Sequence, residues 1–203
     1  MRTQADINAA YEAGRYLYSS FNKNITVTMG AGVAQDLSGL PGNPVAQYYL
    51  GAVGTSTGLY RSTDWGLNHG QNVDTKKYLH TVLLNTVTAM TPIKVRILDY
   101  LMFYPFIGMD TGLQNLTNTI TLPRYAAREG VQMMLVEQNP YTGSAQVQIG
   151  YTNQDGVAGR LTPIIRLNTA TSIGTIATSE RRTLGVTGNF CALQQGDYGV
   201  QSV

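Results

Sequence analysis

The 203-residue chain has few charged residues. Asp, Glu, Lys and Arg together make up 13 % of it, about half the usual share of a soluble domain. Thr, Gln, Asn, Gly and Tyr take their place, while the apolar content is ordinary. Disordered chains are rich in charge and poor in aromatic residues, so this composition argues against disorder. It is typical of all-β folds and of proteins whose surface is largely covered by copies of themselves.

The charges that are present form no cluster. The net charge is +2 at neutral pH, and the basic residues are scattered along the chain. A nucleic-acid-binding protein carries a basic patch or stripe. The nearest candidate is the pair Arg181 and Arg182, and two adjacent charges are more typical of a solvated loop. We therefore expect no nucleic-acid partner.

Cysteine and long apolar runs are also scarce. Cys191 is the single cysteine, which excludes an intrachain disulfide and a thiolate metal cage. The longest apolar run, Leu101 to Ile107, is too short to span a bilayer. The first residues contain no apolar core of a secretory signal. These absences predict a soluble protein, made in a cytoplasm and without a membrane contact.

One motif resembles a catalytic sequence pattern. Residues 54–58 (GTSTG) match the GxSxG pattern of a nucleophile elbow, with Ser56 as the nucleophile and His80 as the available base. Either Asp64 or Asp74 would have to supply the acid. The elbow requires a strand before it and a helix after it, and the residues that follow carry no helical stripe. We therefore expect no catalytic residue and no enzymatic activity.

Other chemistry has weaker support. The two histidines, His69 and His80, form no HxH or HxxxH pair, so we predict no metal site and no cofactor. Carboxylates in or beside the aromatic segment leave glycoside hydrolysis open: Asp99, Asp110, Glu129 and Glu137. Asp110, in a GMDTG sequence, is more typical of a turn cap. A carbohydrate-binding face is an alternative that requires three exposed rings: Trp65, Tyr60 and Tyr104.

Residues 3–22 carry the clearest helical pattern, with apolar residues at helical spacing: Ile7, Ala10, Tyr11, Gly14, Leu17, Tyr18 and Phe21. Thr3 and Asp6 form a capping-box-like start, and Asn22 and Asn24 mark the expected end. This helix either packs on its own domain or forms an arm that docks on a neighbouring subunit. We divide the chain into an N-terminal helix or arm (1–24) and a body (25–203).

The body reads as strands separated by turns. Glycine and proline break its first part into short pieces, and we expect short strands at 25–29, 46–53 and 59–61. Longer strands are expected at 78–88, 93–103, 130–138, 145–151 and 161–167, with a last short one at 189–193. The turn Asn153–Gly156 predicts a hairpin between the strands at 145–151 and 161–167. This spacing predicts a mainly β fold: a jelly-roll-like β-sandwich with an N-terminal α-helix.

The most aromatic stretch runs from Tyr100 to Phe106. Pro105 indicates that its rings leave a strand end and enter a loop. Large apolar residues in a loop are covered either by their own domain or by a partner, and the sequence leaves both open. The candidate interface residues come from this loop and from the helix: Tyr11, Leu17, Tyr18, Phe21, Phe103, Tyr104 and Phe106.

Residues 99–136, with the pattern DYLMFYPFIGMDTG…NTITLPRY…GVQMMLV, resemble structural proteins encoded beside the capsid genes of tailed bacteriophages. The helical N-terminus and the low-charge composition fit the same picture. The resemblance implies a virion component made in the host cytoplasm: a head decoration or cement-like protein with a jelly-roll body, or a neck or tail subunit. It also implies a homo-oligomer, a trimer being one form, with the major capsid protein as partner. It carries over no catalytic residue.

Overall fold

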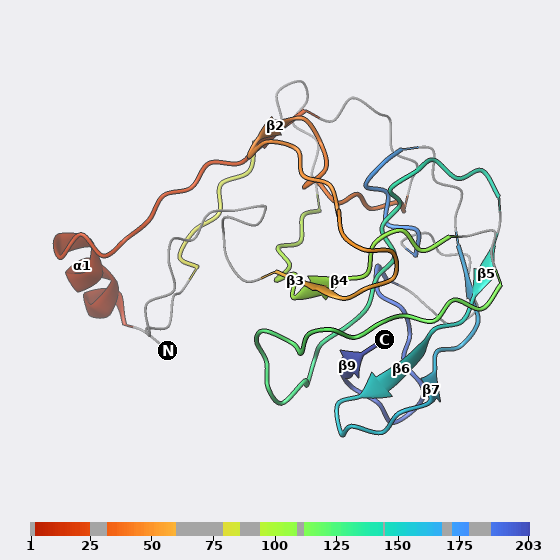
Figure 1. The fold of residues 1–203 in the computed structure, drawn as a ribbon. Helices are drawn as coiled ribbons and strands as arrows, with labels where there is room; N and C mark the ends of the chain where they lie inside the picture. Colours follow the sequence, from red (N-terminus) through yellow and green to blue (C-terminus); the bar gives the residue numbers. More distant parts are fainter. Residues whose placement is uncertain are drawn as a thin grey trace.

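A computed structural model describes residues 3–24, 32–59, 79–85, 94–108, 112–143, 145–167, 172–178 and 188–203. In these ranges the chain forms one short helix and small antiparallel strand pairs (Figure 1), so the mainly β prediction is confirmed. The sheets contain two or three strands each and are open. They do not establish the finer prediction of a jelly-roll sandwich.

The helix, α1 (Gln4–Glu12), begins where the sequence predicts. Thr3 Oγ1 accepts a hydrogen bond from the backbone N of Asp6 at 3.3 Å, and Asp6 Oδ2 accepts one from the backbone N of Thr3 at 2.9 Å. This reciprocal pair is a capping box, which satisfies backbone donors that a helix start leaves free. The predicted helix start is confirmed.

The predicted helix end, near Asn22, is wrong. Gly14 has φ +65°, its backbone N donates to Tyr11 O at 2.9 Å, and the backbone N of Arg15 donates to Ala10 O at 2.8 Å. These two bonds form a Schellman motif, in which a glycine takes the left-handed conformation and stops the helix. The apolar spacing alone did not reveal that Gly14 terminates the helix.

The strands of the described residues are short. They are β1 (Asn22–Lys23), β2 (Gly42–Asn43), β3 (Thr57–Gly58), β4 (Met102–Phe103), β5 (Gln146–Val147), β6 (Gly150–Asn153), β7 (Arg160–Leu161), β8 (Ile165–Arg166) and β9 (Val200–Ser202). They pair antiparallel as β1–β2, β3–β4, β5–β8 and β7–β6–β9.

The predicted hairpin is confirmed. Gly150 of β6 lies opposite Leu161 of β7, and Gln146 of β5 lies opposite Arg166 of β8, so residues 146–151 and 160–166 run antiparallel. The turn between them contains Gly156 at φ +81°, a conformation that favours glycine. Local turn chemistry therefore fixes this part of the fold.

The hydrophobic core lies against this hairpin. Its fully buried members are Ile165, Leu167, Ala177 and Cys191, and the side chains packed against them are Met133, Leu135, Ala145, Val147 and Ile149. Ala145, Val147 and Ile149 alternate along the chain, so one face of this strand segment packs on the core. The segment predicted as a strand at 130–138 forms no strand, only a bridge at Val136. Its backbone bonds are divided among several partners: Met133 O accepts from Cys191 and Leu135 O from Ala177.

Other predicted strands do not form in the described residues. Residues 46–50, 79–85 and 189–193 carry no strand, residues 51–53 form a bend and turn, and of 94–103 only β4 is paired. A strand needs a partner, and β propensity measures how well a side chain packs in a sheet rather than a backbone preference. Several sites of sequence interest lie outside the described residues: 25–29, Tyr60, Asp64, Trp65, His69, Asp74, Asp110, Arg181 and Arg182.

The N-terminal segment stands apart from the sheets in Figure 1. None of the residues of α1 is buried. An extended stretch leads from α1 to β1, which pairs with β2, whereas the C-terminus lies beside β6. The division into an arm (1–24) and a body (25–203) remains a prediction.

Candidate functional site

The predicted interface residues of the arm are mostly exposed. Tyr11 is 49 % exposed, Leu17 59 % and Tyr18 83 %. The Tyr11 ring stacks on Tyr16 at 5.0 Å between centroids and meets the edge of His80 at 6.0 Å. Tyr11 thus links α1 to the described segment around His80, and Leu17 and Tyr18, which follow α1, present large side chains to solvent.

The base of the arm, in contrast, is held firmly. Lys23 Nζ donates to three backbone oxygens, those of Ser38 (3.3 Å), Leu40 (2.9 Å) and Pro44 (2.6 Å). Partial burial lowers the pKa of Lys23, and the nearby Asp36 opposes that shift. The Lys23 ammonium thus ties β1 to the loop that surrounds β2.

A glycine makes this attachment possible. Gly42 of β2 has φ +136°, and a Cβ at this position would lie 2.0 Å from Asn22 O. β1 and β2 can approach each other only because Gly42 has no side chain. Phe21, the last predicted interface residue of the arm, is half buried here, with Lys23 Nζ 5.5 Å from its ring centroid.

The predicted interface residues of the aromatic loop are divided by the fold. The Phe103 ring packs edge-on against Tyr49 at 5.1 Å between centroids. Tyr104 Oη donates to Asn118 Oδ1 at 2.6 Å and accepts from the backbone N of Val203 at 3.2 Å. Phe106 is 49 % exposed. Two of these three rings are therefore engaged by their own chain, and Phe106 is the one that faces outward.

Beneath Phe103 lies a buried polar cluster. Tyr49 Oη and Ser38 Oγ both donate to Asp36 Oδ2, the serine at 2.7 Å, and the backbone N of Ser38 donates to Asp36 Oδ1 at 2.9 Å. Burial, and then the negative charge of Asp36, raises the pKa of the Tyr49 hydroxyl. Each acceptor oxygen of Asp36 has a donor, so this cluster serves to fix the loop after residue 35.

Ser56, the serine of the GTSTG sequence, is a structural residue in this geometry. It is buried, and its Oγ accepts from the backbone N of Thr119 at 2.8 Å and of Ile120 at 3.3 Å. His80 Nδ1 instead bonds to Thr81 Oγ1 at 3.1 Å. Within the described residues, no contact joins Ser56 to His80. The serine links the segment before β3 to the segment around residue 119.

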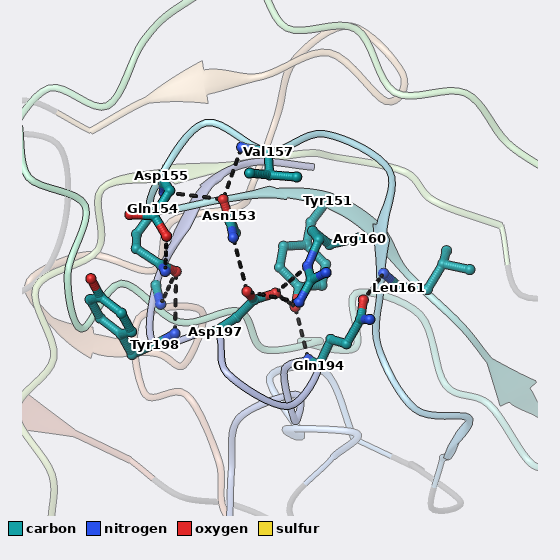
Figure 2. Close-up of polar contacts among 11 residues, drawn as sticks. Tyr151, Asn153, Gln154, Asp155, Val157, Arg160, Leu161, Gln194, Asp197 and Tyr198 are labelled. Atoms are coloured by element: carbon teal, nitrogen blue, oxygen red, sulfur yellow. Dashed lines mark hydrogen bonds and ion pairs between the residues drawn. The ribbon is translucent and has the colours of Figure 1, made fainter.

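The densest polar cluster in the described residues surrounds Asp197 (Figure 2), and we call it the Asp197 hub. Arg160 donates to both carboxylate oxygens, from Nε at 2.8 Å and from Nη2 at 3.1 Å. Tyr151 Oη donates to Oδ2 at 2.6 Å, and Asn153 Nδ2 donates to Oδ1 at 2.9 Å. The Asp197 side chain is 3 % exposed, and its donors come from β6 and β7.

Further hydrogen bonds extend the hub. Tyr151 Oη accepts from the backbone N of Gln194 at 2.8 Å, and Gln154 Oε1 accepts from the backbone N of Tyr198 at 3.2 Å and of Gly199 at 3.1 Å (Figure 2). The guanidinium of Arg160, more than any other group, lowers the pKa of Asp197. Both carboxylate oxygens of Asp197 have donors, and the hub attaches residues 194–199 to the hairpin.

Sequence reasoning missed this hub. Asn153 was recognised only as a turn residue, and Asp197 lies in a QQGDYG sequence that has the composition of an ordinary loop. The bonds between Tyr151 and Asp197 span 46 positions. A spacing of that length carries no motif, so no local signal could have paired them.

Two further features concern metal ligands and membrane spans. In the described part of the chain, no three His, Cys, Asp or Glu residues come together as a metal-binding group. In the same ranges, no helix reaches the length and apolar character that a membrane crossing requires. Comparisons with protein families, with curated proteins and with solved structures found no match.

Proposed function

We propose that this chain is a non-enzymatic structural subunit of a bacteriophage particle, which binds neighbouring subunits of the capsid surface and reinforces it. The observation that supports this proposal is the arm. α1 buries none of its residues, and the segment that follows exposes Leu17 and Tyr18 at 59 % and 83 %. Large apolar side chains that cluster on a surface mark sites of protein contact.

The construction of the arm suits binding to another subunit. Lys23 and the β1–β2 pair hold its base, while α1 buries none of its residues. A standard interface buries on the order of 1,600 Å². Repetition of a modest contact around a symmetric shell raises the effective concentration and makes attachment nearly permanent. We propose a homo-oligomer, a trimer being one form, that attaches to the major capsid protein.

The jelly-roll-like β-sandwich belongs to the same proposal. One described strand pair closes over a long connection, that of β6 with β9. A strand that returns by a long connection to lie beside an earlier strand is a feature of Greek-key sheets. An experimental structure of the assembled form, with the strand order traced across residues 25–203, tests this part of the proposal.

The arm is tested with a double variant, Leu17→Ser with Tyr18→Ser. Both side chains are exposed, so the variant should keep the far-ultraviolet circular dichroism and the Tm of the wild type. It should nevertheless fail to join capsid shells in a co-sedimentation assay with purified particles. Leu113→Ser is the matched control, because Leu113 is 94 % exposed on a different segment, and it should still bind.

The two outcomes that oppose the proposal are distinct. If the double variant still binds, the arm is not part of the interface. If the wild-type protein does not bind particles, the proposed function is wrong. A neck or tail subunit is the alternative within the same class, and labelling of the protein in intact virions separates the positions.

A carbohydrate-binding or host-recognition module is the alternative from another class. The hollow next to the Asp197 hub is lined by Gly159, Leu161, Thr162, Pro163, Gln194 and Gln195. It contains no aromatic ring on which a sugar could stack. Binding of the isolated protein to a glycan array would favour this module over the structural subunit.

A further inference from the structure

Three segments far apart in sequence lie side by side near the core. Residues 34–36 and 135–137 flank residues 174–177, with Gln35 opposite Thr175 and Val136 opposite Ile176, both antiparallel. On one side the backbone N of Ile176 donates to Ala34 O at 2.9 Å. On the other side the backbone N of Glu137 donates to Thr175 O at 2.8 Å. The segment 174–177 is therefore the central member of a small three-part sheet.

The register of this sheet places three oxygen-bearing side chains in one row. Since Val136 lies opposite Ile176, Glu137 lies opposite Thr175, and Gln35 lies opposite the same threonine from the other side. Gly174, at φ +87°, donates to Glu137 O at 2.8 Å, as the glycine of a G1 bulge does. Directly opposed residues of antiparallel segments point to the same face. Gln35, Thr175 and Glu137 thus share one face of the sheet.

The oxygens of this row are acceptors without matching donors. Gln35 Oε1 is buried and accepts no hydrogen bond within the described residues. Its amide cannot be turned around to relieve this, because Nε2 already donates to Ile173 O at 3.0 Å. Thr175 uses its hydroxyl proton in a 2.7 Å bond to Ser172 O, which leaves the lone pairs of its Oγ1 as acceptors.

Glu137 completes the row. The residue is 7 % exposed, and within the described ranges no hydrogen bond or ion pair reaches its carboxylate. On the same face, two positions away on each segment, lie Leu135 and Ala177 of the hydrophobic cluster. Burial accordingly raises the pKa of Glu137. Its carboxylate oxygens are not among the fully buried atoms that lack a partner, so they reach solvent at the edge of the row. A carboxylate largely removed from water favours a cation, a donor or a proton beside it.

We propose that Gln35, Thr175 and Glu137 form a binding site for a hard divalent cation of the Ca²⁺ type, which clamps the three segments together. Such ions take carboxylate, amide and hydroxyl oxygens, and Ca²⁺ accepts irregular arrangements of them more readily than Mg²⁺. The described residues contain no group of three or more His, Cys, Asp or Glu side chains that could hold a metal ion. This site has one acidic residue, Glu137, and its other ligands are the amide and hydroxyl oxygens of Gln35 and Thr175. Binding keeps Glu137 ionised and releases its proton where the carboxyl is protonated.

The test is the thermal unfolding of the full chain in Ca²⁺ and in EDTA. A ligand that binds only the folded state raises the Tm, and at 100 times its Kd the shift for a chain of this size is about 5–10 °C. Mg²⁺ at the same concentration should give a smaller shift. Glu137→Gln should abolish the Ca²⁺ shift and keep a Tm in EDTA at or above that of the wild type, because a neutral amide is cheaper to bury than a carboxylate.

The matched control is Glu129→Gln, which removes the same charge from an exposed position and should keep the full Ca²⁺ shift. A wild-type protein whose Tm is the same in Ca²⁺ and EDTA overturns the proposal, and the row is then neutralised by a proton alone. Equal losses in Glu137→Gln and Glu129→Gln also overturn it, since the effect would be one of general surface charge. Calorimetric titration with Ca²⁺ gives an independent readout, with one bound ion expected per wild-type chain and none in Glu137→Gln.

Discussion

The contribution of the Asp197 hub to stability can be tested by removing one oxygen atom, the hydroxyl of Tyr151. This hydroxyl donates to Asp197 at 2.6 Å and accepts from the backbone N of Gln194 at 2.8 Å. Tyr151→Phe removes one oxygen and leaves a buried acceptor and a buried donor each short of a partner, which costs about 1–3 kcal/mol. Urea unfolding followed by circular dichroism should show a lower midpoint with an unchanged slope.

Tyr198→Phe is the control for this variant. The Tyr198 side chain is 54 % exposed, and its backbone, rather than its ring, contacts Gln154. Its unfolding midpoint should equal that of the wild type. Equal midpoints for Tyr151→Phe and the wild type would mean that the hub contributes nothing to stability.

Asp197 also makes the fold sensitive to acid. Its bond from Arg160, followed by those from Asn153 and Tyr151, lowers its pKa below the ordinary value of 3.8. A carboxylate with a lower pKa in the folded state contributes stability above its unfolded pKa, and this contribution is lost as the pH falls toward the folded pKa. The free energy of unfolding should therefore fall as the pH drops from about 5 to 3.

The variant Asp197→Asn isolates this contribution. It should be less stable than the wild type at pH 7 and should lose less stability on acidification, as urea midpoints at several pH values would record. Glu137 acts in the opposite direction, because burial raises its pKa, and it is present in both proteins, so it cancels in the comparison. Parallel pH profiles for the two proteins would contradict the assignment.

Elements that depend on residues close together in sequence could be predicted, whereas elements that depend on distant segments could not. The capping box of Thr3 and Asp6 and the turn Asn153–Gly156 involve residues three positions apart, so the sequence displays them directly. Residues 46–53 and 93–101 have strand-like composition, yet whether they pair depends on segments that no local pattern identifies. The same reasoning explains why the row of Gln35, Thr175 and Glu137 could not be foreseen.

Adding one methyl group at Gly42 should disrupt the pairing of β1 with β2. Gly42→Ala places a Cβ 2.0 Å from Asn22 O at a φ that favours glycine, so β1 should separate from β2 and release Lys23. Trypsin should then cleave after Lys23 faster than in the wild type, as mass spectrometry of timed digests would measure. Cleavage after the exposed Arg15 provides an internal reference.

Gly14→Ala is the matched glycine variant for this experiment. Gly14 has a positive φ but open space around it, so its substitution imposes backbone strain without a clash between strands. Cleavage after Lys23 should then remain slow. Equally slow cleavage in Gly42→Ala would show that the arm is not held by the β1–β2 pair.

The low charge of the molecule predicts how it associates. Only 13 % of its residues are charged, and the large exposed side chains of the proposed interface, Tyr11, Leu17 and Tyr18, are uncharged, so contacts between subunits should depend little on ion pairs. Salt screens ionic contacts but does not weaken apolar ones. Sedimentation velocity should show self-association that increases with protein concentration. This association should be as strong or stronger in about 500 mM NaCl than in about 50 mM NaCl.

Dissociation in high salt would contradict this prediction, because it would place the contacts on charged groups. The double variant Leu17→Ser with Tyr18→Ser should remain monomeric at both salt concentrations. Leu113→Ser should associate like the wild type, since its segment lies outside the arm.

The Asp197 hub has a consequence for the time course of folding. The bond from Tyr151 to Asp197 closes a loop of 46 positions, and β6 cannot acquire β9 until that loop has closed. The entropy cost of closing a loop arises before the contacts that the closure allows can form, so chains dominated by contacts between distant residues fold slowly. On the ribosome the hairpin emerges before residue 197, and during that interval β6 lacks both its β9 partner and the Asp197 anchor.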